Sequence, residues 1–372
     1  MSTTRQIWLV RIPTHDRRWL LHPPHLLERI ASALMLKRID ARVIDANLRP
    51  LDAVQLADAA TGDLAVVFRA DPAERKAVGQ WLKTLRASSK DLPLAVVGDC
   101  GDPDLFLQAG ANLVLTGEAD GAVEQLLSFT AKQRAHVVAD PIADPAQWPL
   151  PAREHLPPEV YYDRTVPAAH PPVAVVEAAR ENPTRRREVD AVFGELDMLA
   201  VSSGVGSVVL VDADIGRDRA WLNELARRVA ERRQPLDLLV TVRPQNDARE
   251  LATALRWCRA VHATVELDDL ADPVTAEATC HALIDAGLAV RVKIDASRPE
   301  PQLAAALHLA RRVRAHDIIF PGEGRRLETT RARKRYLQMP WTLLRNAAHA
   351  TLRRPLWWLD AARMFGPLVS RE

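Results

Sequence analysis

The stretch AGANLVLTGEADGAVEQLL, residues 109–127, decides how the first part of the chain folds. Its aliphatic run from Leu113 to Gly117 predicts a strand that ends in glycine, and residues 118–130 predict the helix that follows. The run from Leu94 to Gly98 repeats this pattern, since it is short, aliphatic and also ends in glycine. Strands that alternate with helices in this way are typical of a parallel sheet covered by helices on both faces.

The same alternation extends toward the amino terminus. Further strands are predicted over residues 7–12, 41–45 and 64–68, and further helices over residues 25–37 and 75–88. We therefore expect a Rossmann-like domain over residues 1–135. Ligands of such sheets bind beyond the carboxyl ends of the strands. The candidate cofactor-binding residues at these ends are Thr14, His15, Arg69, Asp71, Gly98, Asp99, Gly101, Gly117 and Glu118.

Two interpretations of these glycines stay open at this point. Glycine after a strand permits close approach of the backbone to a ligand, but it also serves simply to end a strand in a tight turn. The chain contains neither a GxGxxG motif nor a phosphate-binding P-loop. His15 is the one histidine at these strand ends that could reach a metal, although a lone histidine in a loop is usually just solvated.

A second alternation follows a proline-rich connector over residues 136–171, where proline excludes helix interiors and central strands. Predicted strands cover residues 173–176, 207–211, 236–242, 260–266, 289–294 and 317–320. Predicted helices cover residues 186–202, 218–232, 248–257, 273–286 and 301–315. These β/α units suit a partial (β/α)6 TIM-like barrel over residues 172–322, with its active face at the carboxyl ends of the strands.

Charged residues gather at the ends of the barrel strands. Asp212 and Asp214 follow the second strand, Arg243 ends the third and Glu266 ends the fourth. We take these four residues as the candidate catalytic or ligand-binding set, because side chains at successive strand ends point into one mouth. They could equally pair with one another as a purely structural polar rim, since clustering is not visible in a sequence.

Taken in order, these segments resemble the class of radical-SAM proteins that carry a cobalamin-binding domain at the amino terminus. The resemblance rests on the Gly117-Glu118 pair, on Trp148 in the connector, on Val265-Glu266, on Pro321-Gly322 and on the run from Arg333 to Pro340. It implies cobalamin in the first domain and SAM in the barrel. Asp99 departs from the pattern, because glycine is usual there. The DxHxxG motif is missing, so cobalamin would bind without a protein histidine on cobalt.

A larger departure concerns the iron–sulfur cluster that the resemblance implies. Such a cluster needs three thiolates in a CxxxCxxC motif, and the aligned positions here are His170, Ala174 and Glu177. Alanine cannot ligate iron, and His170 with Glu177 would supply only two ligands for any other metal. We therefore expect no iron–sulfur cluster, no metal site and no reductive cleavage of SAM by this chain.

Two classes of function remain compatible with the sequence. The first is a non-catalytic homologue, a pseudoenzyme that binds cobalamin or a tetrapyrrole-like ligand and is an accessory partner of a cluster-bearing biosynthetic enzyme. The second is an enzyme that performs non-radical, cobalamin- or SAM-dependent methyl transfer, or a different small-molecule reaction in the barrel mouth. Loss of all three thiolate positions favours the first class.

Composition places limits on partners and location. The chain has 372 residues and a net charge of +2, which gives no general attraction to nucleic acid. Its 3 cysteines are far apart and form no CxxC pair, a usage typical of a reducing compartment. The first residues lack the apolar run of a signal peptide, and no apolar run approaches the ~20 residues that span a bilayer. We expect a cytoplasmic protein.

The segment over residues 323–372 is predicted to be a basic, aromatic helical tail. From Gly324 to Glu372 it has 11 basic and 3 acidic residues, a net charge of about +8. Trp357 and Trp358 lie next to Arg353 and Arg354 in the sequence. Residues 341–365 could pack on the chain's own domains, bind a partner, or lie on an anionic membrane surface.

Overall fold

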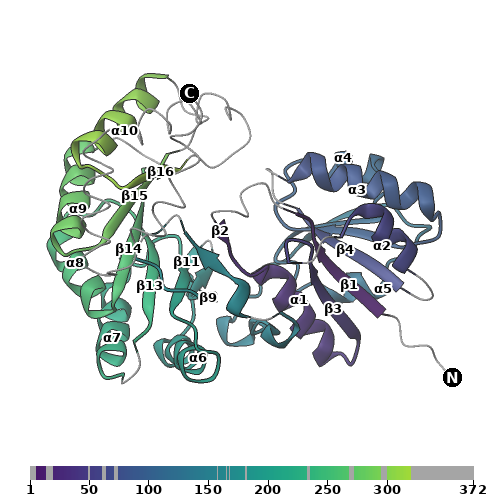
Figure 1. Ribbon diagram of the computed structural model, residues 1–372, viewed down its shortest axis with the longest axis horizontal. Helices are drawn as coiled ribbons and strands as arrows, with labels where there is room; N and C mark the ends of the chain where they lie inside the picture. Colours follow the sequence, from purple (N-terminus) through teal and green to yellow (C-terminus); the bar gives the residue numbers. More distant parts are fainter. Residues whose placement is uncertain are drawn as a thin grey trace. The chain divides into compact units, whose positions relative to one another are not determined.

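A computed structural model describes most of the chain (Figure 1). The described residues are 6–13, 20–48, 51–60, 64–70, 74–156, 158–164, 166, 168–180, 182–232, 235–267, 272–294 and 300–319. They form two compact units, Met1–Val160 and Tyr161–Glu372. The tail predicted over residues 323–372 lies outside the described residues, as do Thr14, His15 and Asp71.

The first unit contains a parallel sheet of 6 strands in the order β3-β1-β4-β5-β6-β7. Its strands are β1 (Gln6–Arg11), β3 (Asp40–Asp45), β4 (Leu64–Arg69), β5 (Leu94–Val97), β6 (Leu113–Gly117) and β7 (Ala135–Ala139). Its helices are α1 (His25–Leu36), α2 (Ala53–Ala59), α3 (Arg75–Ser88), α4 (Pro103–Gln108) and α5 (Val123–Ser128). The short elements are β2 (Leu20–Leu21) and the 3₁₀ turns Pro145–Gln147, Arg153–His155 and Pro158–Val160.

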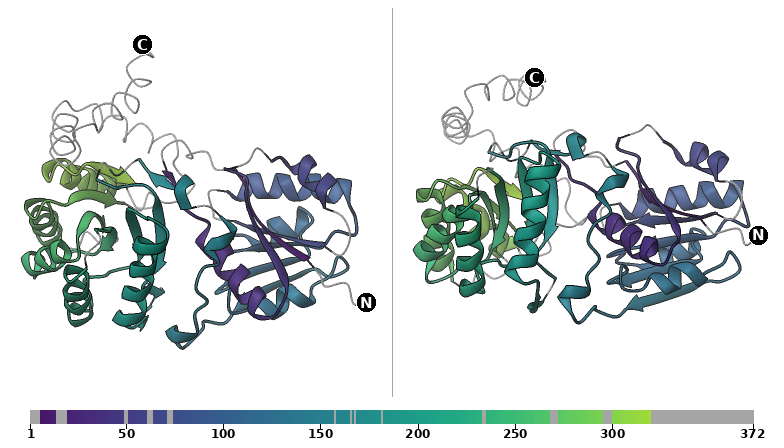
Figure 2. Two further views of the ribbon diagram at one scale, coloured as in Figure 1. Left: turned by 60° about the horizontal axis from the view of Figure 1, so that its bottom comes forward. Right: turned by 90° about the horizontal axis from the view of Figure 1, so that it is seen from below.

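Alternating side chains let this sheet bury both of its faces. On one face Val66, Phe68 and Val96 pack with Leu82 of α3 and Phe106 of α4, and α2 joins the same core. Helix α1 contacts β1, β3 and α5. Figure 2 shows the layers of this unit from two further sides. The Rossmann-like fold expected for the first part of the chain is confirmed.

The second unit contains another parallel sheet of 6 strands, and here the spatial order follows the chain, β9-β12-β13-β14-β15-β16. Its strands are β9 (Val173–Glu177), β12 (Ser207–Val211), β13 (Asp237–Val242), β14 (Ala260–Glu266), β15 (Ala289–Lys293) and β16 (Asp317–Ile319). Its helices are α6 (Val189–Ser202), α7 (Arg219–Ala230), α8 (Ala248–Trp257), α9 (Pro273–Asp285) and α10 (Glu300–Arg312). Short strands are β8 (Tyr162–Asp163), β10 (Ala179–Arg180) and β11 (Asn182–Arg186). The partial β/α barrel expected from the sequence is confirmed.

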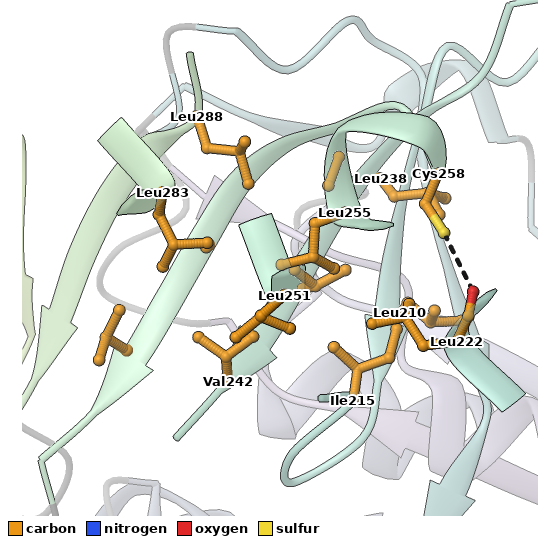
Figure 3. Packing of buried hydrophobic residues seen from close by; sticks show 14 of the residues in the cluster. Leu210, Ile215, Leu222, Leu238, Val242, Leu251, Leu255, Cys258, Leu283 and Leu288 are labelled. Carbon is orange, nitrogen blue, oxygen red and sulfur yellow. Dashed lines mark hydrogen bonds between the residues drawn. The ribbon is translucent and has the colours of Figure 1, made fainter. Parts of the chain in front are cut away.

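The core of the second unit fixes which way its strand residues point. Val242, Leu251, Leu255 and Leu283 are buried in one cluster between the strands and the helices (Figure 3). Cys258 lies in the same cluster, and its Sγ is 3.8 Å from the carbonyl oxygen of Leu222.

Val265 and Val292 also belong to this cluster. Since successive strand residues point to opposite faces, Glu266 and Lys293 must point away from the helices. The helix-facing aliphatic residues thereby place charged side chains on the inner face of the barrel.

Three local predictions differ from the structure. Strand β7 was not predicted, because Ala135–Ala139 lies where the first domain was expected to end. The helix expected from residue 118 begins at Val123, since turns closed by Ala119 N to Gly117 O and Gly121 N to Glu118 O come first. The helix expected from residue 186 begins at Val189, because β11 pairs with β10 as a hairpin.

Among the described residues, no helix combines the length and apolarity needed to cross a membrane.

Candidate functional site

Arg186 and Asp212 form a buried ion pair at the carboxyl end of the barrel strands. The Nη2 atom of Arg186 lies 2.9 Å from Oδ2 of Asp212, and the two side chains are only 5% and 2% exposed. The guanidinium also stacks on the ring of Trp221, 4.8 Å from its centroid. Burial raises the pKa of the Asp212 carboxyl, and the charge of Arg186 opposes this rise. The pair therefore joins hairpin strand β11 to the end of β12.

Asp214 connects the ends of two neighbouring strands. Its Oδ1 accepts hydrogen bonds from the backbone amides of Arg243 and Gly216, both at 3.2 Å. The side-chain amide of Gln245 donates to the same carboxylate at 3.2 Å. Burial raises the pKa of Asp214, while these hydrogen bonds oppose the rise. The predicted candidate Asp214 thus has a structural task, because it holds backbone amides that no strand partner satisfies.

Arg243, Glu266 and Lys293 form the more accessible part of the mouth. Glu266 accepts a hydrogen bond from Nζ of Lys293 and lies 3.9 Å from Nη2 of Arg243. The side chains of Arg243 and Lys293 are 48% and 33% exposed, whereas that of Glu266 is 10% exposed. The structure therefore brings together two of the predicted candidates, Arg243 and Glu266, and adds Lys293 as a second cation.

The hairpin β10–β11 and the residue that follows it contribute two more buried arginines. Arg180 donates from Nε to Glu177 at 3.0 Å, and Arg187 donates from Nη1 to Glu195 at 2.6 Å. Arg187 also donates to the carbonyl of Glu177 at 2.9 Å, and its own carbonyl accepts from Nε1 of Trp221 at 2.8 Å. These contacts were not predicted. The sequence signal was the basic run Arg185-Arg186-Arg187 between the first barrel strand and the helix that follows it.

The three positions aligned with cluster cysteines do not converge. Ala174 lies within β9 and belongs to the core beneath the helices. Glu177 lies three residues further along the same strand, so its side chain points to the opposite face. His170 lies before the strand, where its amide bonds Ser207 Oγ at 2.6 Å and its Nδ1 lies 2.5 Å from Asp237 Oδ2. The alignment of these positions with one cluster is wrong on geometric grounds.

The cysteines themselves do not fit a cluster either. Cys100, Cys258 and Cys280 are the chain's three cysteines, and all are buried. Cys258 ends α8 and Cys280 lies within α9, and burial raises the pKa of each thiol to about 12. Each of the three cysteines belongs to a core cluster of buried apolar residues, so it packs as a small apolar side chain. Within the described part of the chain, no group of three or more His, Cys, Asp or Glu residues could hold a metal ion.

Two of the predicted glycines in the first unit serve the unit's own backbone. A Cβ on Gly98 would lie 2.8 Å from the carbonyl oxygen of Ala70, and one on Gly117 would lie 2.5 Å from that of Ala139. Both glycines also have positive φ angles, 115° and 78°. These glycines are sufficiently explained by the tight turns they form, because the neighbouring backbone lies too close for a side chain.

The remaining predicted residues of this edge divide into two groups. Glu118 accepts a hydrogen bond from the backbone amide of Ile142 at 2.8 Å, so its carboxylate also serves the fold. Asp99 and Gly101 are exposed, and Arg69 is partly exposed. A Cβ on Gly101 would meet only a guanidinium nitrogen of Arg75, at 3.6 Å. Arg69, Asp99 and Gly101 are therefore the predicted residues of this edge that stay at least partly accessible to solvent.

A buried charge cluster at the ends of β1 and β3 was not predicted. Arg11 Nη1 lies 3.5 Å from Asp45 Oδ2 and donates to the carbonyl of His22 at 2.5 Å. Glu28 of α1 is 2% exposed beside them. Burial raises the pKa of Glu28 to about 7, with Arg153 opposing and Asp45 assisting the rise.

Among the comparisons with known proteins, the one with solved structures shows the fold. No protein-family model matches the sequence, and no curated protein matches it. Among solved structures, the radical S-adenosylmethionine methyltransferase TsrM from Kitasatospora setae, with tryptophan and a SAM analogue bound, matches 85% of this chain and 72% of its own length, with a TM-score of 0.59 and 15% identity. TsrM with cobalamin and a [4Fe-4S] cluster bound matches 86% of this chain and 75% of its own length, with a TM-score of 0.57 and 15% identity.

The cobalamin-dependent S-adenosylmethionine radical enzyme OxsB, with aqua-cobalamin bound, is similar over 91% of this chain, with a TM-score of 0.62 and 12% identity. The chain spans only 56% of the length of OxsB. At these identities the similarity shows a shared fold.

Proposed function

We propose that this chain, which has the fold of cobalamin-dependent radical SAM enzymes, binds cobalamin or a related ligand and acts as a non-catalytic accessory partner of a cluster-bearing biosynthetic enzyme. The observation that carries this proposal is the arginine hairpin that follows β9. Arg180 and Arg186 of the hairpin and the adjoining Arg187 are held by Glu177, Asp212 and Glu195, respectively. The hairpin contains no thiol, and neither does β9.

The chemistry of the cluster explains why this observation favours an accessory role. An iron–sulfur cluster is held by cysteine thiolates, and it supplies the electron that cleaves SAM. The three thiols of this chain lie elsewhere and are buried. The buried carboxylates of the mouth find their counter-charges within the protein, so they need no cofactor to neutralise them.

Cobalamin is the ligand that the first unit fits best under this proposal. When bound, it supplies a cobalt centre for group transfer. Arg69 would offer a cation to the ligand's polar side groups, and Gly101 would leave space for it beside Asp99. The binding expected is base-off without a protein histidine on cobalt.

A spectral titration with hydroxocobalamin tests the binding. Gly117→Trp is an unsuitable variant, because a side chain there collides with the backbone of Ala139. Gly101→Trp is the informative variant, and Gly204→Trp is its matched control. Gly204 also has a positive φ, 60°, but it lies in the other unit, and no atom lies within 4 Å of its Cβ position. We expect binding by the parent and the control and loss of binding in Gly101→Trp. No binding by the parent at high micromolar concentration overturns the ligand assignment.

One observation favours the second function class, an enzyme acting by non-radical, cobalamin- or SAM-dependent methyl transfer or by another small-molecule reaction in the barrel mouth. Arg243 and Lys293 are partly accessible on either side of Glu266, an arrangement suited to a ligand that carries both charges. Calorimetric titration with SAM separates the two classes. Binding that Glu266→Gln abolishes would favour the enzyme, and the absence of binding would favour the accessory role.

The absence of a cluster from this chain, on which the accessory role depends, is testable separately from any ligand. Reconstitution of this chain with iron and sulfide under anaerobic conditions is expected to leave it without a cluster. A stoichiometric four-iron cluster would contradict the accessory role. Membrane contact through residues 341–365 stays a proposal, because these residues lie outside the described part of the chain.

A further inference from the structure

A groove runs between helices α7 and α8 on the helical layer of the second unit. Its volume is about 770 Å³. Small residues line part of it, namely Ala226 and Ala230 from α7 and Ala254 from α8. Trp257, at the end of α8, also lines the groove and is 62% exposed. Small side chains next to a protruding aromatic ring are the features of a helix-packing surface.

Three residues of α8 lie on one face of the helix within this groove. Arg249, Thr253 and Trp257 are spaced by four residues, so each lies about 6 Å along the axis from the next. Arg249 is exposed and makes no ion pair among the described residues. By contrast, Arg227 is paired with Glu224 and Glu231. The groove therefore has an unpaired cation at one end and an exposed aromatic face at the other.

This spacing is symmetric about Thr253. If α8 packs antiparallel on a second α8 with the twofold axis at Thr253, Arg249 of each copy lies opposite Trp257 of the other. A guanidinium over an indole face is a favourable cation–π contact, and the symmetry forms it twice.

We infer that the α7–α8 groove is the interface of a homodimer in which Arg249 and Trp257 pair across a twofold axis at Thr253. A second copy is the occupant that this face of α8 fits, because the exposed Arg249 and Trp257 complement each other across the axis. This inference is independent of the function proposed above, because it involves neither unit's strand-end residues.

Sedimentation velocity of the full chain over a concentration series tests the dimer. The parent is expected to sediment with twice the 41.3 kDa mass of the chain. Trp257→Ala and Arg249→Glu should each raise the dissociation constant of the dimer by roughly 30-fold or more, as expected for a central aromatic or arginine contact. Arg256→Glu is the matched control, since Arg256 is an exposed neighbour on α8 outside the groove lining, and should leave it unchanged.

Disulfide trapping locates the axis directly. Thr253→Cys should form an intermolecular disulfide under mild oxidation, because a residue on a twofold axis meets its own copy, whereas Arg256→Cys should not. The native cysteines are buried and do not interfere. A monomer at every concentration overturns the inference. A dimer that neither Trp257→Ala nor Arg249→Glu weakens also overturns the inference. The same holds for a dimer that is trapped by Arg256→Cys but not by Thr253→Cys.

Discussion

The two units have the same kind of sheet, yet they organise the carboxyl edges of their strands differently. In the first unit, Gly98 and Gly117 relieve crowding between neighbouring backbones. In the second unit, Asp212, Asp214 and Glu266 hold cations and backbone amides at the corresponding edge. The comparison shows that a residue at a strand end first serves the fold. It either leaves space for a neighbouring backbone or balances a buried charge, whether or not a ligand binds there.

Removing the central cation of the second unit's edge should have the largest effect. Arg186→Met leaves the Asp212 carboxylate buried without its counter-charge, so we expect about 3–5 kcal/mol less stability at pH 7. Because burial raises the pKa of Asp212, this loss should shrink as the pH falls and the carboxyl becomes protonated. Urea unfolding at several pH values measures it.

Arg227→Met is the matched control, because its ion pairs with Glu224 and Glu231 are exposed. It should cost less than about 1 kcal/mol. Equal losses in the two variants would show that the edge of the second unit is not held by buried charge.

Glu28 tests whether buried charge also matters in the first unit. Its pKa is about 7 in the folded protein, above the ordinary value of 4.5, so the folded state favours the protonated acid. The free energy of unfolding therefore falls as the pH rises from about 4.5 through 7, because the buried carboxyl must ionise. This loss of stability is complete above pH 7. Glu28→Gln should gain about 3 kcal/mol at pH 8 and nothing below pH 4.5.

The measurement is urea unfolding of the parent and Glu28→Gln across pH 4 to 8. A gain that is the same at both ends of this range would mean that titration of Glu28 is not its cause.

The glycine edge can be tested by adding one methyl group. Gly117→Ala places a Cβ 2.5 Å from the Ala139 carbonyl oxygen at a φ of 78°, so we expect a loss of about 2 kcal/mol or more. Gly204→Ala has a similar φ of 60° but open space, and should lose about 1 kcal/mol. Thermal melting compares the two. A smaller loss at Gly117 than at Gly204 would remove crowding as the explanation of the first unit's edge.

The smallest effect on stability is expected where the second unit's edge is accessible. Arg243→Met removes a side chain that is 48% exposed and 3.9 Å from Glu266, so the free energy of unfolding should fall by less than about 1 kcal/mol and the melting temperature should change little. Ligand affinity is the quantity that should fall if the mouth binds a ligand. An early melt with unchanged affinity for every tested ligand would make Arg243 part of a structural rim.

Much of the fold could be predicted from the sequence because strand runs are local. Each aliphatic run, such as Leu94–Val97 or Ser207–Val211, lies within a few residues of its predicted position. Hydrophobic periodicity over such a run reports burial directly. The order of these strands and helices along the chain then predicted the fold that the similar solved structures share.

The candidate site could be predicted only in part, because pairing depends on residues that are distant in the chain. The sequence placed Asp212, Arg243 and Glu266 at strand ends, but it did not show that Arg186 from a hairpin would neutralise Asp212. It also aligned Ala174 and Glu177 with one cluster, although the period of two in a strand separates them onto opposite faces.

By itself, therefore, the sequence determined the order of strands and helices and the absence of thiols from the first barrel strand, since both are properties of contiguous residues. Only the tertiary structure decided what each strand-end residue does. Glu118, expected to face a ligand, instead accepts the amide of Ile142, and Gly117 makes room for Ala139. Both partners lie more than twenty residues away along the chain, and only the packing of β6 beside β7 brings them near.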